Sequence, residues 1–223
     1  VVEPNQEFNV AEYCRLVWQV IQKIQKAGKL PIIVGGTGFY IQAVINGIES
    51  LGIPPNLQLR KKLEKKSVAT LFSELETLDP FRAANMNLSD RKNPRRLVRA
   101  LEIANWRLEH LAQKPSSPLE NLNCFFIGLK APYKVLYKRI GSRVDERIKQ
   151  GAEQEIKNLL KRGYRWDNSA LGATIGYREW RPFFEKQEIK DEIIKKWKFA
   201  EHAYARRQMT WFKKNKIIHW FDI

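Results

Sequence analysis

Apolar side chains recur at intervals of three and four residues in several segments, and this spacing predicts amphipathic helices. The first such segment covers residues 11–29, where Gly28 supplies a stop. A short apolar run rich in β-branched residues follows at 30–34 and predicts a buried parallel strand. Residues 35–38, with the sequence Gly-Gly-Thr-Gly, connect this run to a second apolar helix that starts near Phe39. Strand, glycine turn and helix in this order indicate half of an α/β unit.

A polar, charged and helical region then interrupts the core pattern. Composition changes after Gly47, two prolines follow at 54 and 55, and helical periodicity covers residues 56–66, 68–78 and 93–110. A loop at 114–118 closes the region, and an apolar run at 124–129 predicts a return to the sheet. Helices and a last strand are predicted after it at 133–151, 153–162, 191–212 and 217–221. We predict an α/β fold with core segments at 1–54 and 119–223 and an all-helical insertion at 55–118.

Charge narrows the choice of partner. Forty lysines and arginines against 24 acidic residues give a formal net charge of +16, which favours nucleic acid ahead of an anionic membrane surface. A solvated basic surface is the alternative. No apolar run reaches the roughly 18 residues of a membrane span, no signal peptide opens the chain, and Cys14 and Cys124 have no paired-thiol or zinc spacing. We expect a cytoplasmic monomer without membrane contact.

The glycine turn is the first candidate for chemistry. Gly35, Gly36 and Gly38 let the backbone come close to a bound group, and the N-terminus of the following helix suits phosphate. The Thr37 hydroxyl can cap that helix or bind a ligand oxygen. A tight strand-to-helix turn needs the same glycines, so a purely structural role stays open. No Lys-Ser or Lys-Thr follows, so the turn is not a Walker P-loop.

Arginines recur every four residues at two places, as the pair Arg95 and Arg99 and as the stripe Arg139, Arg143 and Arg147. Residues four apart share one face of a helix, and arginine forks suit phosphate oxygens. Glu146 lies beside the stripe and could neutralise one of its arginines. Each set is either an anion clamp, for a diphosphate or an RNA backbone, or an ordinary surface with ion pairs.

Two C-terminal segments, residues 173–179 and 204–212, interleave basic and aromatic side chains. Such segments suit looped RNA, whose bases stack on rings while arginines hold phosphates. Trp211 and Trp220 could instead serve only the core. The histidines have no metal-ligand spacing, so no protein metal site is predicted, at His110, His202 or His219.

Together these segments resemble the tRNA dimethylallyltransferases, also called tRNA isopentenyltransferases. Residues 34–40 are similar to the family signature VGGTGLY. Residues 79–84 and 96–103 resemble the "DP..A … RL.RALEV" stretch, and residues 175–179 and 205–212 resemble "IGY.E" and "A.RQ.TWF". These segments occur in the family's order and extend over nearly the whole chain.

The resemblance implies a P-loop NTPase-like core with a helical insertion that grips a tRNA anticodon stem-loop. It also implies transfer of a dimethylallyl group from dimethylallyl diphosphate to N6 of adenine 37, with Mg²⁺ as cofactor. Thr37 is then expected in the catalytic channel, and Gly35, Gly36, Gly38 and Arg143 are expected around the diphosphate. Arg60 matches a tRNA-contacting arginine. The other residues in segments matched to tRNA contacts are Arg95, Arg96, Arg99, Thr174, Gly176, Tyr177, Arg178 and Arg207.

Two family features have no counterpart here, the P-loop of the GPT.SGK[ST] type and the aspartate regarded as general base. We therefore expect the N-terminally incomplete core to be completed upstream of Val1 and the 223 residues alone to be inactive. The link at 87–93 is also longer than usual. Competing interpretations are an adenylate isopentenyltransferase, which needs no large insertion, a small-molecule P-loop kinase, and a non-catalytic RNA-binding protein.

Overall fold

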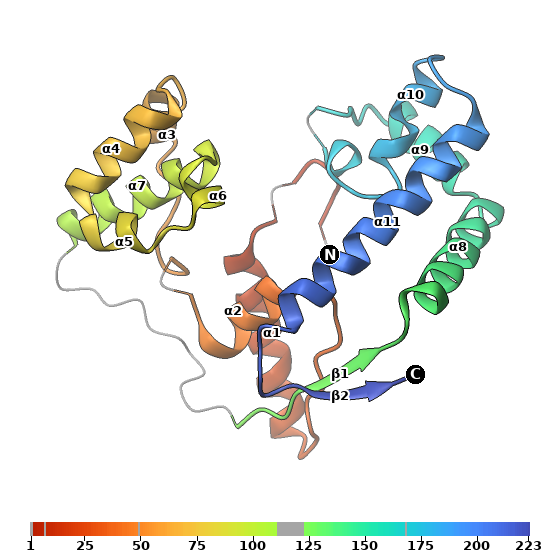
Figure 1. Cartoon of the computed structure of the whole chain (residues 1–223), viewed down its shortest axis with the longest axis horizontal. Helices are drawn as coiled ribbons and strands as arrows, with labels where there is room; N and C mark the ends of the chain where they lie inside the picture. The colour runs from red at the N-terminus through yellow and green to blue at the C-terminus, as the bar shows by residue number, and fades with distance from the viewer. Residues whose placement is uncertain (1, 7, 49, 111–122, 168) are drawn as a thin grey trace. The chain divides into compact units, whose positions relative to one another are not determined.

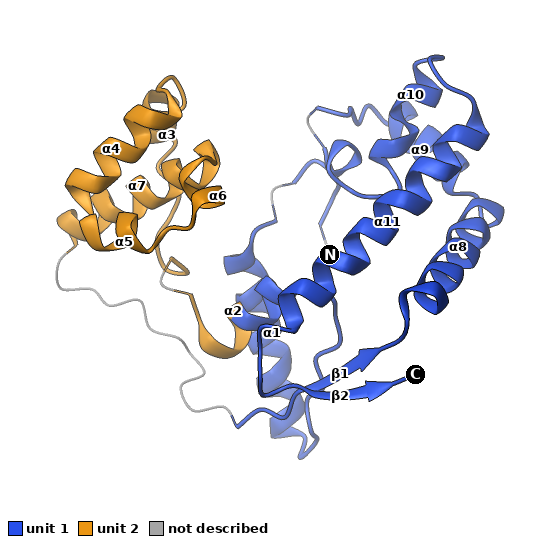
Figure 2. Cartoon of the chain, viewed as in Figure 1, with its two compact units in different colours: residues 1–42, 121–223 blue, residues 43–120 orange. Residues whose placement is uncertain are grey.

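The computed structural model describes residues 2–6, 8–48, 50–110, 123–167 and 169–223 (Figure 1). The chain divides into two compact units, coloured separately in Figure 2: unit 1 comprises residues 1–42 and 121–223, and unit 2 comprises residues 43–120. The insertion predicted at 55–118 falls inside unit 2. The loop predicted at 114–118 lies outside the described residues. Within the described ranges, no helix is both long and apolar enough to cross a membrane.

Unit 1 is mainly helical. Its first helix, α1 (Val10–Lys26), starts with a capping box in which Asn9 and Glu12 bind each other's backbone N–H groups. Helix α2 (Gly38–Asn46) begins in unit 1 and ends in unit 2. The later helical elements are α8 (Tyr133–Lys149), α9 (Ala152–Lys161), η1 (Ala170–Gly172), η2 (Arg178–Trp180), α10 (Arg181–Phe184) and α11 (Lys190–Phe212). The three long helices predicted in this half of the chain are confirmed as α8, α9 and α11.

The described sheet has two strands, β1 (Ile127–Lys130) and β2 (His219–Asp222), which pair in parallel with Ile127 opposite His219 (Figure 1). Both were predicted. Gly128 is required by close approach, because a Cβ there would lie 2.6 Å from the Trp220 ring.

The strand predicted at 30–34 is wrong. No strand is formed there, and the side chains of Leu30, Ile32 and Val34 are 83%, 77% and 91% exposed. A parallel strand needs a hydrogen-bonded neighbour and cover on both faces. Among the described residues β1 and β2 pair only with each other. An apolar run rich in β-branched residues can form a strand, but residues 30–34 have no strand beside them with which to pair among the described residues.

Unit 2 consists of α3 (Leu57–Leu63), α4 (Val68–Leu78), α5 (Pro80–Asn85), α6 (Leu88–Arg91) and α7 (Pro94–Glu109). Each helix starts after a polar residue whose side chain accepts a backbone N–H, respectively Asn56, Ser67, Asp79, Asn87 and Asn93. Helices α3, α4 and α7 were predicted. Residues 79–80 start α5, because Asp79 caps the helix and Pro80 suits its first position.

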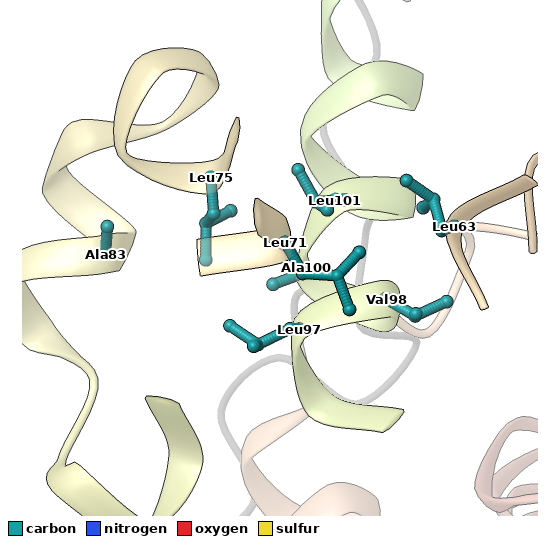
Figure 3. Close-up of a cluster of buried hydrophobic side chains, with 8 residues drawn as sticks. All are labelled: Leu63, Leu71, Leu75, Ala83, Leu97, Val98, Ala100 and Leu101. Carbon is teal, nitrogen blue, oxygen red and sulfur yellow. The ribbon is translucent and has the colours of Figure 1, made fainter. Parts of the chain in front are cut away.

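Each unit has its own hydrophobic core. In unit 2, Leu71 and Leu75 of α4 pack with Leu97 and Leu101 of α7 (Figure 3). The unit 1 core joins α8, α9, η1, η2 and α11 through Val144, Ile156, Leu171, Trp180, Ile193 and Trp197. Helices α8 and α11 are also linked by an ion pair, Asp145 with Lys198 at 2.7 Å. The core contacts and this ion pair together determine which face of α8 packs against which face of α11.

Candidate active site

The glycine turn at 35–38 lies against the C-terminal part of α11. A Cβ added to Gly36 would collide with the side-chain amide of Gln208, and one added to Gly38 would collide with the Trp211 indole. Neither glycine has a positive φ. Gly38 therefore needs to be glycine for close approach to the Trp211 ring, whereas the end of the flexible Gln208 side chain can move away from a Cβ at position 36. The close packing at Gly38 supports the structural interpretation of the turn.

Thr37 is exposed, and its hydroxyl oxygen lies 3.3 Å from the hydroxyl of Tyr204 on α11. Its carbonyl accepts the backbone N–H groups of Tyr40 and Ile41 at the start of α2. The main chain of Thr37 thus starts the helix, while its side chain turns to α11. The hydroxyl is held at the surface of unit 1, available to a bound molecule.

Two arginines of the α8 stripe share one carboxylate. Arg143 Nη2 lies 3.6 Å and Arg147 Nη1 lies 3.1 Å from the carboxylate of Glu201, whose side chain is 11% exposed. The two arginine side chains are 53% and 46% exposed. One negative charge therefore faces two positive charges, and the guanidinium groups stay open to an anion. The partner predicted for the stripe was Glu146, but Glu201 of α11 takes this role because α8 packs on α11.

A single face of α11 collects these contacts. Trp197, Glu201, Tyr204, Gln208 and Trp211 follow one another at intervals of four, three, four and three residues, which places them on one side of the helix. We call this set the α11 stripe. The residues of the stripe contact, in order along the helix, the 173–178 segment, the arginine pair of α8, Thr37 and the two glycines beside Thr37.

The segment at 173–178 packs at the first residue of the α11 stripe. Gly176 has φ +91°, and a Cβ there would lie 2.7 Å from the Trp197 ring. The Tyr177 hydroxyl donates to Glu155 at 2.8 Å, and burial together with this bond raises the pKa of Tyr177 to about 12. Thr174 is exposed. Arg178 pairs at 2.7 Å with Glu179, which also accepts the backbone N–H of Gly176.

In unit 2, two of the predicted tRNA-binding arginines surround a buried carboxylate. Glu102, whose side chain is 1% exposed, accepts two bonds of 2.8 Å from Arg60 and one of 3.2 Å from Arg99. The backbone N–H of Asn56 donates to the same carboxylate at 2.8 Å. Burial alone would raise the pKa of Glu102, but these hydrogen bonds outweigh it and lower the pKa below the ordinary value. Arg60 and Arg99 thus hold unit 2 together, whatever else they bind.

The remaining predicted arginines are more accessible. Arg95 is exposed, and Arg96, with a side chain 58% exposed, pairs with Asp90. On α11, Arg207 is exposed, with its guanidinium 5.5 Å from the centre of the Tyr204 ring. The predicted tRNA-contacting residues belong to both units, with Arg60, Arg95, Arg96 and Arg99 in unit 2 and Thr174, Gly176, Tyr177, Arg178 and Arg207 in unit 1.

A sequence model of the family described as IPP transferase matches residues 1–215. The chain belongs to this family. Among its relatives is the tRNA dimethylallyltransferase of Anoxybacillus flavithermus, 38% identical over 225 residues that cover 100% of this chain and 71% of that protein. The tRNA dimethylallyltransferase of Roseiflexus sp. is 36% identical over 96% of this chain and 70% of its own length.

Solved structures of IPP transferases share the fold. The tRNA isopentenylpyrophosphate transferase of Bacillus halodurans is 34% identical, with a TM-score of 0.65 over 99% of this chain and 69% of that one. The Staphylococcus epidermidis enzyme is 28% identical, with a TM-score of 0.62 over 99% of this chain and 72% of that one. A eukaryotic dimethylallyltransferase acting on tRNA, at 22% identity and a TM-score of 0.76, adds likeness of fold alone. The predicted family, enzyme class and P-loop NTPase-like fold class are confirmed.

Mg²⁺ is implied by the resemblance. In the part of the chain that the structure describes, no three or more His, Cys, Asp or Glu side chains gather as metal ligands. We therefore assign no step to Mg²⁺ and no protein ligand for it.

Sequence reasoning missed Glu201, Tyr204 and Gln208 as candidate site residues. In the sequence, the segment at 204–212 is distinguished only by its mixture of basic and aromatic side chains. The signal that could have found them is the spacing of the α11 stripe, which repeats every seven residues across polar and aromatic types. A polar residue on the packed side of a helix indicates a polar contact, but the sequence alone does not identify the partner in that contact.

Proposed function

We propose that this chain carries the prenyl-transfer site of a tRNA dimethylallyltransferase. The reaction transfers a dimethylallyl group from dimethylallyl diphosphate to N6 of adenosine 37 in the anticodon stem-loop of a tRNA. The observation that supports this proposal most is that Thr37 and the Arg143–Arg147 pair both contact residues of the α11 stripe. Tyr204 and Glu201, which hold these two groups, are three residues apart, or about 4.5 Å along the helix axis.

The chemistry requires stabilisation of a leaving group. In the transfer, a bond forms between N6 and the allylic carbon while the bond from that carbon to the diphosphate oxygen breaks. The diphosphate leaves with the bonding electron pair, and N6 loses a proton to a base that we do not assign. Negative charge therefore grows on the diphosphate, where preorganised donors lower the barrier. Arg143 and Arg147 suit this role, because their charges exceed that of Glu201 and both remain about half-exposed.

Thr37 is proposed to face the reacting groups. Its hydroxyl is exposed and fixed by a neighbour, as expected for a side chain that orients an amine or a departing oxygen. The target adenine must leave the base stack to reach it. The N-terminal end of α2, which begins at Gly38, offers further backbone N–H groups.

Recognition of tRNA is proposed to use exposed basic residues of both units. Arg95 and Arg96 of α7 and Arg207 of α11 present charge at the surface, and Thr174 and Arg178 add donors near the α11 stripe. Phosphate contacts of this kind supply affinity that falls as salt rises. A single copy of the chain acting on tRNA in the cytoplasm, without membrane contact, is part of the same proposal.

The test is prenylation of an anticodon stem-loop with adenines at 36 and 37, using dimethylallyl diphosphate, Mg²⁺ and the complete product of the gene. Mass spectrometry of the digested RNA locates the added group. Thr37→Ala and Arg143→Ala are expected to lose transfer strongly. Arg162→Ala is the matched control, because that arginine sits in an exposed ion pair with Glu3.

The outcomes separate the competing functions. Prenyl transfer to free adenosine phosphate in preference to the stem-loop would indicate an adenylate isopentenyltransferase. Salt-sensitive RNA binding with no product from either substrate would refute the transferase proposal and leave an RNA-binding protein. A parallel sample of the 223-residue chain tests the expectation that it is inactive alone.

A further inference from the structure

The α11 stripe connects the two halves of the proposed site. Glu201 holds Arg143 and Arg147, and one turn further along the helix Tyr204 meets Thr37. Gln208 and Trp211 then contact the glycines on either side of Thr37, and the Trp211 ring leaves no room for a Cβ at Gly38. The backbone of the turn is therefore fixed on α11, while the χ1 angle of Thr37 is left to be set by a side-chain contact.

Tyr204 makes that contact. Among the described residues, its hydroxyl is the only side-chain hydrogen-bonding partner recorded for the Thr37 hydroxyl, at 3.3 Å. The ring of Tyr204 is itself restrained, since the Arg207 guanidinium lies over it at 5.5 Å. Threonine has staggered χ1 rotamers that aim its hydroxyl in different directions. A fixed phenol on one side selects the rotamer whose oxygen faces it.

We propose that Tyr204 is a positioning residue for the transfer reaction, whose hydroxyl holds the Thr37 hydroxyl in its working orientation. This proposal rests on the proposed function of Thr37. It adds a residue that touches neither the diphosphate nor the adenine and acts through Thr37. Its effect belongs to the bound complex, where orientation decides the rate, and it should leave substrate affinity unchanged.

Tyr204→Phe removes the hydroxyl and keeps the ring. We expect kcat to fall about fivefold, because the loss of one ordinary hydrogen bond changes an equilibrium constant by about that factor. KM for the stem-loop and for dimethylallyl diphosphate should stay within about twofold, because ground-state contacts are retained. In a Thr37→Ala background the same substitution should have no further effect, because its target is gone. Tyr164→Phe is the control: it deletes a hydroxyl that bonds Glu3 at 2.7 Å and does not contact Thr37.

A second measurement does not depend on transfer. Three-bond NMR couplings to the γ-methyl carbon of Thr37 report its χ1 angle. They should indicate one rotamer in the wild-type protein and averaging in Tyr204→Phe, with the Tyr164→Phe spectrum unchanged.

Several results would overturn the proposal. They are an unchanged kcat, a loss in the Thr37→Ala background equal to that in the wild type, a raised KM for RNA at constant kcat, or unchanged χ1 couplings. If no variant or wild-type sample transfers a prenyl group, yet Thr37 averages only in Tyr204→Phe, the contact stands. The proposed function and the positioning role built on it then both fail.

Discussion

Glu102→Gln tests whether unit 2 depends on one buried carboxylate. The substitution keeps the shape of the side chain and removes the charge that faces Arg60 and Arg99. Arg99 also donates to the backbone carbonyls of Ser50 at 3.2 Å and Ile53 at 2.8 Å. The network therefore ties α3, α7 and the chain before α3 to one point, and its loss should loosen all three.

The magnitude follows from burial. Removing one partner of a buried ion pair typically costs about 3–5 kcal/mol, because the other charge is left uncompensated. The Glu102 side chain is 1% exposed, but those of Arg60 and Arg99 are 35% and 29% exposed and can be partly rehydrated. We therefore expect the lower end, about 3 kcal/mol off the free energy of unfolding of unit 2.

Hydrogen exchange read by mass spectrometry is the assay, since peptides from α3 and α7 report on unit 2 within the intact chain. A loss of about 3 kcal/mol corresponds to roughly a 100-fold drop in protection of their slowest amides. Glu74→Gln is the matched control, because Glu74 pairs with Lys66 at the surface and should change stability by less than about 1 kcal/mol. Equal protection in both variants would refute the reasoning.

The pH dependence gives an independent check. The pKa of Glu102 is lowered in the folded state from an ordinary value of 4.5, so its stabilising contribution is complete above that value. The contribution is lost as pH falls through the lower, folded-state pKa. The gap in stability between wild type and Glu102→Gln should therefore be largest near neutral pH and should narrow in acid. A gap that stays constant down to the lowest pH of the folded protein would contradict the assignment.

Three further predictions concern unit 1. Gly38→Ala should displace the turn from the Trp211 ring and abolish most prenyl transfer while the circular dichroism spectrum stays native; full activity would contradict the close packing. Gly176→Ala combines a positive φ with a Cβ 2.7 Å from Trp197, so urea unfolding should show a loss of about 2–4 kcal/mol. Tyr177, with a pKa raised to about 12 by burial and by its bond to Glu155, should add a step near pH 12 to an ultraviolet titration of the protein, and this step should be missing in Tyr177→Phe. Its stabilising contribution should be complete below pH 10 and be lost as pH rises through about 12, and Tyr177→Phe should remove that part of the alkaline loss.

The arginines show how far sequence reasoning about the site could go. Helical spacing correctly placed Arg143 and Arg147 on one face of α8, because that spacing is local. It could not identify their partner, since Glu201 lies 54 residues beyond Arg147 in sequence. The same limit applied to Arg60, whose partner is 42 residues away. The charge of an arginine predicts the kind of group that it can bind, whereas tertiary packing decides which carboxylate is its partner in the folded protein.

By itself, the sequence determined the long helices and the order of the family segments. A helix depends on interactions between residues within about four positions of each other, so the local sequence pattern is enough to predict it. Tertiary structure alone decided that residues 30–34 form no strand, because pairing needs a partner that an apolar run cannot supply. It also brought Thr37 to Tyr204 across 167 residues of chain. Such a contact is set by how α11 packs against the rest of unit 1, which no local pattern encodes.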